Sequence, residues 1–211
     1  MIKRDVVLVL APHTDDGELG CGGTIARFIE EGKQIYYAAF STAADSVPEP
    51  FPSNILEKEV REATKTLGIP EQNLILFDYQ VRKLEYQRQD VLEDMIRLKE
   101  EIDPEIVFLP CANDLHQDHI TIYNEGLRAF KQCTVLGYEL PWNNITFHTR
   151  HFVFLKERHI NRKFEALRCY CSQKDRHYVN HDFIYGLART RGVQLGMEYA
   201  EAFDVIRWVL A

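Results

Sequence analysis

The sequence lacks the features that mark membrane and secreted proteins. Its 211 residues contain no run of 18 apolar residues, which argues against a membrane-spanning helix. The N-terminal Met-Ile-Lys-Arg-Asp lacks the apolar stretch of a secretory signal peptide and leads directly into a predicted strand. A soluble, cytoplasmic protein without a membrane span is therefore expected.

Cysteine is scarce and irregularly spaced. The five cysteines are an odd number and form no C-x-x-C pair, so neither a disulfide framework nor a zinc ribbon is predicted. The C-x-C at Cys169 and Cys171 is interpreted as two ordinary thiols.

Positive charge is also in deficit. Lysine and arginine number 25 against 32 acidic residues, for a formal charge of −7. Proteins that bind nucleic acid need a basic surface, so a nucleic-acid partner is not expected. Net charge does not exclude a small anionic ligand, because such a ligand responds to local charge.

The sequence does contain a regular alternation of apolar strands and amphipathic helices. The predicted strands are Val6–Leu10, Ile35–Phe40, Leu74–Phe77, Ile106–Leu109 and Thr134–Leu140. The predicted helices between them are Gly22–Glu31, Ile55–Leu67, Gln89–Glu101 and Ile120–Lys131. After Trp142 the pattern is less regular, with a strand at Phe152–Leu155, a helix at Asn161–Tyr170 and a strand at Ala202–Val209. This order predicts a single α/β domain over residues 1–211, with a Rossmann-like, doubly wound, mostly parallel sheet covered by helices on both faces.

Polar clusters follow two of the predicted strands. The first strand leads into A-P-H-T-D-D-G-E-L-G-C-G-G-T, and the fourth leads into D-L-H-Q-D-H at residues 114–119. A strand order of 3-2-1-4-5 makes these two strands neighbours at the point where the order reverses. Ligands of open parallel sheets bind at that point, beyond the carboxyl ends of the strands. We therefore expect both clusters to line one crevice.

The residue types in the two clusters suit a metal. Two histidines and a carboxylate form the ligand set of open catalytic zinc sites and of non-haem iron(II) enzymes. Each cluster also has a simpler interpretation. Asp15 or Asp16 could cap the following helix, and Asp118 could do the same in a solvated loop.

The paired motifs resemble those of a known family. P-H-T-D-D-G-E-L-G-C-G-G-T together with H-Q-D-H is similar to the motifs of the LmbE-like or PIG-L family of metal-dependent N-deacetylases. The similarity extends to E-V-R-E-A-T-K-T-L-G from Glu59 and to Y-A-E-A-F from Tyr199. Two positions depart from the usual P-H-P-D-D-E motif: Thr14 replaces a proline and Gly17 replaces a glutamate.

The resemblance implies a role for each polar side chain. By this resemblance, the expected metal ligands are His13, Asp16 and His119. They would hold Zn²⁺, with Fe²⁺ or another divalent metal as alternatives. Asp15 would be the general base. His116 would stabilise the oxyanion, with Asp118 holding the imidazole ring and favouring its charged form. The role of Asp114 stays open.

Several other residues and segments have both a functional and a structural interpretation. Arg82 follows the third strand and, by resemblance, is a candidate substrate-binding residue. The G-x-G-G at Gly20–Gly23 lacks the dinucleotide-binding spacing and is predicted to serve close helix–sheet packing. The basic stretch Lys163–Arg176 is interpreted as a solvated helical face. Five further histidines without ligand spacing are interpreted as structural: His148, His151, His159, His177 and His181.

These observations predict a hydrolase that uses metal-activated water to remove the acetyl group from an N-acetylated amino sugar of the N-acetylglucosamine type, or from its glycoconjugate. The alternatives are a hydrolase of another small amide at the same site and a metal-binding protein without turnover. The expected partner is a small-molecule sugar, and homo-oligomerisation is left open.

Overall fold

The computed structural model describes residues 5–210, so Met1–Arg4, on which the signal-peptide argument partly depends, lie outside the described residues. Within them, seven strands form one sheet in the order β3-β2-β1-β4-β5-β7-β6. The strand bounds are β1 Val6–His13, β2 Gln34–Ser41, β3 Leu74–Leu76, β4 Ile106–Pro110, β5 Thr134–Tyr138, β6 His151–Leu155 and β7 Tyr199–Arg207. Strands β1 to β5 pair in parallel, whereas β7 runs antiparallel to both β5 and β6. The predicted order 3-2-1-4-5 and the mostly parallel sheet are confirmed.

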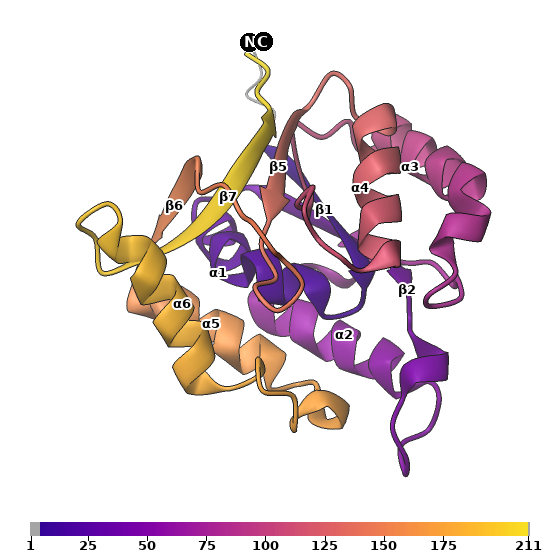
Figure 1. Cartoon of the computed structure of the whole chain (residues 1–211), viewed down its shortest axis with the longest axis horizontal. Coiled ribbons are helices and arrows are strands. Elements are labelled where there is room, and N and C mark those ends of the chain that lie inside the picture. The colour runs from indigo at the N-terminus through magenta and orange to yellow at the C-terminus, as the bar shows by residue number, and fades with distance from the viewer. Residues whose placement is uncertain (1–4, 211) are drawn as a thin grey trace.

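Helices cover both faces of the sheet, as the doubly wound prediction requires (Figure 1). One face carries α1 (Asp16–Glu30), α2 (Ile55–Leu67), α5 (Glu157–Leu167) and α6 (His181–Val193). The opposite face carries α3 (Arg88–Ile102) and α4 (Gln117–Ala129). Each layer of helices encloses its own apolar core against the sheet. None of the helices between residues 5 and 210 has the length and apolar character to cross a membrane.

Several element boundaries differ from the prediction, and the differences matter at the site. Strand β1 continues to His13, and α1 begins at Asp16 rather than Gly22. The apolar periodicity hides this early start, because the helix is broken at Cys21, where φ is −143° and ψ is 20°. Helix α6 is absent from the prediction, since it buries only three residues and so has little apolar pattern.

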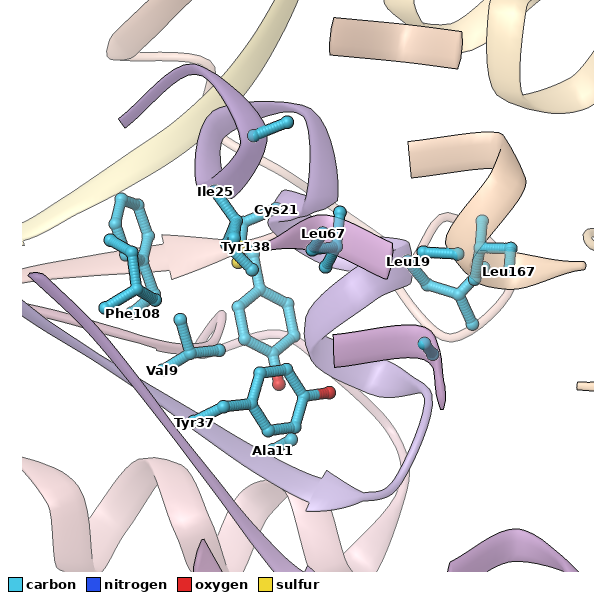
Figure 2. Close-up of a cluster of buried hydrophobic side chains, with 14 of the residues drawn as sticks. Val9, Ala11, Leu19, Cys21, Ile25, Tyr37, Leu67, Phe108, Tyr138 and Leu167 are labelled. Atoms are coloured by element: carbon cyan, nitrogen blue, oxygen red, sulfur yellow. The ribbon is translucent and has the colours of Figure 1, made fainter. Parts of the chain in front are cut away.

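The glycines of α1 confirm the prediction of close packing. A Cβ atom at Gly20 would lie 2.3 Å from the ring of Tyr138, and one at Gly17 would lie 2.5 Å from the ring of Tyr37. Figure 2 shows both tyrosine rings next to Val9 on β1. Large aromatic side chains of the sheet therefore occupy the space that side chains on the helix would need.

A buried ion pair supports the break in α1. The Lys163 ammonium donates to the Leu19 carbonyl and to Glu201, each at 2.7 Å. Glu201 in turn accepts from the backbone N–H groups of Gly23 and Thr24, at 3.0 and 2.6 Å. The pair thus satisfies backbone groups that the break at Cys21 releases. Lys163 is 4% exposed, so the interpretation of this residue as part of a solvated face is wrong.

Candidate metal centre and active site

The two polar clusters converge at the carboxyl ends of β1 and β4. His13 is the last residue of β1, Asp16 is the first of α1, and His119 lies in the first turn of α4. Asp16 Oδ2 lies 3.0 Å from His13 Nδ1 and 3.3 Å from His119 Nε2. The two ring nitrogens are 3.4 Å apart. Three donor atoms from three elements thus form a nearly equilateral triangle.

The size of this triangle fits a metal ion. Ligands at about 2.0–2.1 Å from a tetrahedral zinc are about 3.3–3.4 Å from one another. The observed donor separations match this spacing without movement of the backbone. A wider group, His13, His116 and His119, also offers three nitrogens within 4.8 Å of one another. The set with Asp16 is tighter and brings a negative charge, which favours a divalent cation.

Two buried aspartates hold the histidine rings of this triangle. Asp118 Oδ2 contacts His13 Nε2 at 2.9 Å, and Asp114 Oδ2 contacts His119 Nδ1 at 2.8 Å. If each ring donates its N–H to its carboxylate, the lone pair of the opposite nitrogen points into the triangle. This carboxylate–histidine arrangement is the usual support for metal-binding imidazoles. It gives Asp114 a role that the sequence left open.

The position of Asp118 differs from the expectation that it holds the ring of His116. Its carboxylate contacts His13, and it also accepts from the backbone N–H groups of Arg82 at 2.6 Å and Leu84 at 3.3 Å. Nor does Asp118 cap α4, because His116 occupies that position and accepts from the Asp118 backbone N–H through Nδ1 at 3.2 Å.

The hydrogen bond to His116 fixes its tautomer. Because Nδ1 accepts, the ring proton of the neutral form resides on Nε2. Burial and the neighbouring His13 and His119 lower the pKa of His116 to about 4. The ring is therefore a neutral N–H donor at pH 7, rather than the imidazolium expected from the sequence. His116 lines the same cleft as the donor triangle.

The charged groups of the triangle shift one another's pKa values. Burial alone would lower the pKa of His13, but Asp16 and the hydrogen bond to Asp118 raise it to about 9. Burial acts in the same direction on His119, where Asp16 and Asp114 raise the pKa to about 10. Burial would raise the pKa of Asp16, yet His119 and His13 hold it well below its usual range. Protons therefore occupy this site in the metal-free protein, and a metal ion bound here would displace them.

Asp15 is placed differently from Asp16. It occupies the N-cap position of α1, but its side chain makes no capping hydrogen bond. The side chain is half-buried in the wall of the cleft. Burial, followed by the adjacent charge of Asp16, raises its pKa to about 6. These are the surroundings of a carboxylate that can exchange a proton near neutral pH.

The cleft around these residues has a volume of about 310 Å³. Arg82 lines it and holds a left-handed φ of 66°. Such a backbone conformation costs a residue other than glycine about 1–2 kcal/mol. The loop after α5 adds Arg176 and Tyr178, and the ring of Tyr178 stacks on Trp142 with centroids 3.9 Å apart. The sequence gives no signal for these last three wall residues, because they follow no motif and come from irregular segments.

A further buried carboxyl group, that of Glu18, lies under the turn that carries Asp15 and Asp16. Glu18 is fully buried and contacts the hydroxyl groups of Tyr37 and Tyr170. Both hydroxyls also lie within hydrogen-bond distance of the Thr14 carbonyl, at 2.9 and 2.8 Å. Burial raises the pKa of Glu18 to about 8, against the opposing effect of these hydrogen bonds. Each tyrosine hydroxyl contacts both Glu18 and the Thr14 carbonyl, which makes four contacts between oxygens. The two hydroxyls provide only two protons for these contacts, and a protonated Glu18 provides a third.

Comparison with known proteins identifies the family. Residues 8–130 match the PIG-L family model, described as GlcNAc-PI de-N-acetylase. The uncharacterized deacetylase YaiS of Escherichia coli K12 is 33% identical over 175 residues, which cover 79% of this chain and 90% of YaiS. The chain belongs to the PIG-L family of deacetylases.

Solved structures share the fold over nearly the whole chain. The conserved protein TT1542 of Thermus thermophilus superposes with a TM-score of 0.80 at 27% identity, covering 97% of this chain and 96% of its own. The N,N′-diacetylchitobiose deacetylase of Pyrococcus horikoshii superposes with a TM-score of 0.82 at 22% identity, covering 97% and 84%. The similarity to the second protein shows a common fold.

Proposed function

We propose that the protein is a divalent-metal-dependent hydrolase that removes the acetyl group from an N-acetylated amino sugar of the N-acetylglucosamine type, or from its conjugate. The observation that carries this proposal is the triangle of His13, Asp16 and His119, with separations of 3.0–3.4 Å. Family membership and the sugar deacetylase among the structural neighbours support it. We assign Zn²⁺ to the triangle, with Fe²⁺ as the alternative.

The bound metal would supply Lewis acidity toward the amide carbonyl and increase the acidity of water. The remaining chemistry is assigned to residues of this chain. Asp15, with a pKa of about 6, accepts a proton from the attacking water and delivers it to the departing amine. His116 donates its Nε2–H toward the carbonyl oxygen as negative charge develops there. Asp118 and Asp114 act through the histidine rings that they hold.

The assignment can be tested by measuring metal content and acetate release on the same preparations. Asp16→Ala should lose most of its metal, and His119→Ala likewise. Asp15→Asn should keep the metal while kcat falls by about 10²–10⁴-fold, the usual contribution of a general base. His116→Ala should also keep the metal and lose about 10²-fold or more in kcat. Loss of metal from Asp15→Asn with retention in Asp16→Ala would reverse the two aspartate roles.

The alternatives give different results in the same assays. A hydrolase of another small amide would release product from a panel of N-acyl amines but not from N-acetyl sugars. A metal-binding protein without turnover would bind about one metal per chain and release acetate from neither panel. A cytoplasmic location, the absence of a nucleic-acid partner and the choice between monomer and homo-oligomer stay predictions.

A further inference from the structure

Two arginines at the cleft lack an acidic partner. Arg82 follows β3, and Arg176 lies in the loop between α5 and α6. Within residues 5–210, neither guanidinium forms a salt bridge. Their hydrogen bonds go to neutral oxygens, Ser46 Oγ at 3.1 Å for Arg82 and Gln173 Oε1 at 3.2 Å for Arg176. Both side chains are exposed to the solvent that fills the cleft.

Most of the other arginines between residues 5 and 210 have an acidic partner, although the exposed Arg162 and Arg168, which lie outside this cleft, have none. Arg27, Arg61 and Arg158 each pair with a glutamate. Arg88 and Arg128 both contact the buried carboxylate of Glu125. The acidic excess of the sequence makes such partners abundant. Arg82 and Arg176 differ from the other unpaired arginines because they share one cleft with the metal triangle, which favours a role in ligand binding.

The backbone of Arg82 is held in a strained position. Its left-handed φ of 66° is accompanied by a hydrogen bond from its N–H to Asp118 Oδ2 at 2.6 Å. Asp118 is the residue that holds the ring of His13. The Arg82 side chain therefore starts from a point fixed relative to the metal triangle. Backbone strain maintained in this way is concentrated at ligand-binding and catalytic positions.

The wall that carries Arg176 also offers an apolar surface. Tyr178 lies two residues further along, and its ring is nearly parallel to that of Trp142, with an interplanar angle of 10°. Tyr178 lines the same cleft as Asp15 and Asp16, so this wall borders the metal triangle. A ligand that reaches the metal triangle is thus bordered by an aromatic pair and by two cations.

We propose that the substrate carries a phosphate or carboxylate group outside its N-acyl group, and that Arg82 and Arg176 bind this anion. This inference rests on the proposed hydrolysis of an N-acyl sugar and specifies its substrate class. Guanidinium groups present paired donors that match both oxyanions. They also offset the repulsion that Asp15, Asp16 and a net charge of −7 exert on an anionic substrate.

The test compares charged and neutral substrates on metal-loaded protein. The neutral substrate is N-acetylglucosamine. The anionic substrates are its 1-phosphate and 6-phosphate and the carboxylate-bearing N-acetylmuramic acid, so that the preferred one distinguishes phosphate from carboxylate. Arg82→Gln and Arg176→Gln are each compared with a neighbouring exposed lysine outside the cleft, Lys83→Gln and Lys174→Gln. Melting temperatures report whether each variant is folded, and Arg82→Lys should recover part of any loss because it keeps the charge.

The wild type should prefer an anionic substrate, and each arginine variant should lower kcat/KM for it by about 10- to 100-fold, as expected for a charge-assisted hydrogen bond. The same variants should lower kcat/KM for N-acetylglucosamine much less, so that the preference for the anionic substrate falls by about tenfold or more. Both lysine variants should behave as the wild type. Equal turnover of charged and neutral substrates, with a ratio that the arginine variants leave unchanged, would overturn the inference and leave the proposed function intact.

A binding measurement separates this inference from the proposed function. Glucosamine 6-phosphate and glucosamine are titrated into the protein by calorimetry, which requires no turnover. Tighter binding of the phosphate, lost in Arg82→Gln and Arg176→Gln, supports the anion site. If no acetylated sugar is hydrolysed, the proposed function fails, and equal binding of the two amines in that case removes the anion site as well.

Discussion

Asp114 offers a sharp test of the metal centre, because it touches the site only through other groups. It is 3% exposed, and its Oδ2 contacts His119 Nδ1 at 2.8 Å. Its Oδ1 accepts from the backbone N–H of His116 at 2.9 Å. Both carboxylate oxygens therefore face N–H donors. Asp114→Asn preserves the shape of the side chain but replaces one acceptor with a donor.

Neither orientation of the new amide satisfies both partners. If the NH₂ group faces the ring, Nδ1 must accept, the ring proton moves to Nε2, and the lone pair directed at the metal is lost. If the NH₂ group faces the backbone of His116 instead, two donors oppose each other. Removal of such a supporting carboxylate weakens metal binding by about 10–100-fold. That range corresponds to about 1.4–2.7 kcal/mol.

The assay is a zinc titration of Asp114→Asn in competition with a chromophoric chelator, with the melting temperature of the metal-free protein as a check on folding. Asp78→Asn is the control, since Asp78 is exposed and lies outside the cleft. Zinc affinity equal to that of the wild type would refute the argument that Asp114 orients His119, provided that the variant is folded.

Three further predictions concern protonation and stability. Because the pKa values of His13 and His119 are about 9 and 10, zinc binding at pH 7 should release up to about two protons. Calorimetry in buffers of different ionisation enthalpy measures this release, and less than about half a proton would contradict the prediction. The zinc affinity should also rise with pH until these pKa values are passed. Lys163→Met leaves the buried carboxylate of Glu201 unpaired and should lower the free energy of unfolding, measured by urea denaturation, by about 3–5 kcal/mol. The control Lys58→Met, at an exposed position, should change it by less than about 0.5 kcal/mol. The pKa of Glu18 is raised from 4.5 to about 8, so this residue contributes stability that is fully present below pH 4.5 and is lost as the pH rises through 8. Glu18→Gln should therefore flatten the pH dependence of stability in the metal-free protein. Parallel stability curves for the two proteins would exclude a neutral Glu18.

The sheet order and the location of the site could be predicted from the sequence because both depend on local patterns. Buried parallel strands are continuous apolar runs, and the motifs at residues 13–16 and 114–119 follow two of them directly. The topology of such sheets then brings those strand ends together. The helix α6 lacked this kind of signal, since most of its surface faces solvent.

The partner of each polar side chain could not be predicted in the same way. The family resemblance implied that Asp118 would hold His116, but the first turn of α4 directs the Asp118 carboxylate across the crevice to His13. Lys163 belongs to a basic stretch whose composition is typical of a solvated face, yet it is buried against a break in another helix. Such pairings depend on the path of a second chain segment, which periodicity does not report.

The two departures from the family motif become intelligible together. A proline at position 14 would restrict the backbone directly, and this chain has Thr14 instead, whose carbonyl lies within hydrogen-bond distance of the hydroxyls of Tyr37 and Tyr170. Tyr37 reaches that carbonyl across Gly17, where a side chain would collide with its ring. It also accepts from the Gly17 N–H at 3.1 Å. The glycine that replaces the usual glutamate thus makes room for the group that holds the loop. The Asp15–Asp16 motif is positioned here by the two tyrosines, so substitution of Gly17 by a larger residue would displace the Asp15–Asp16 backbone rather than restore the usual motif.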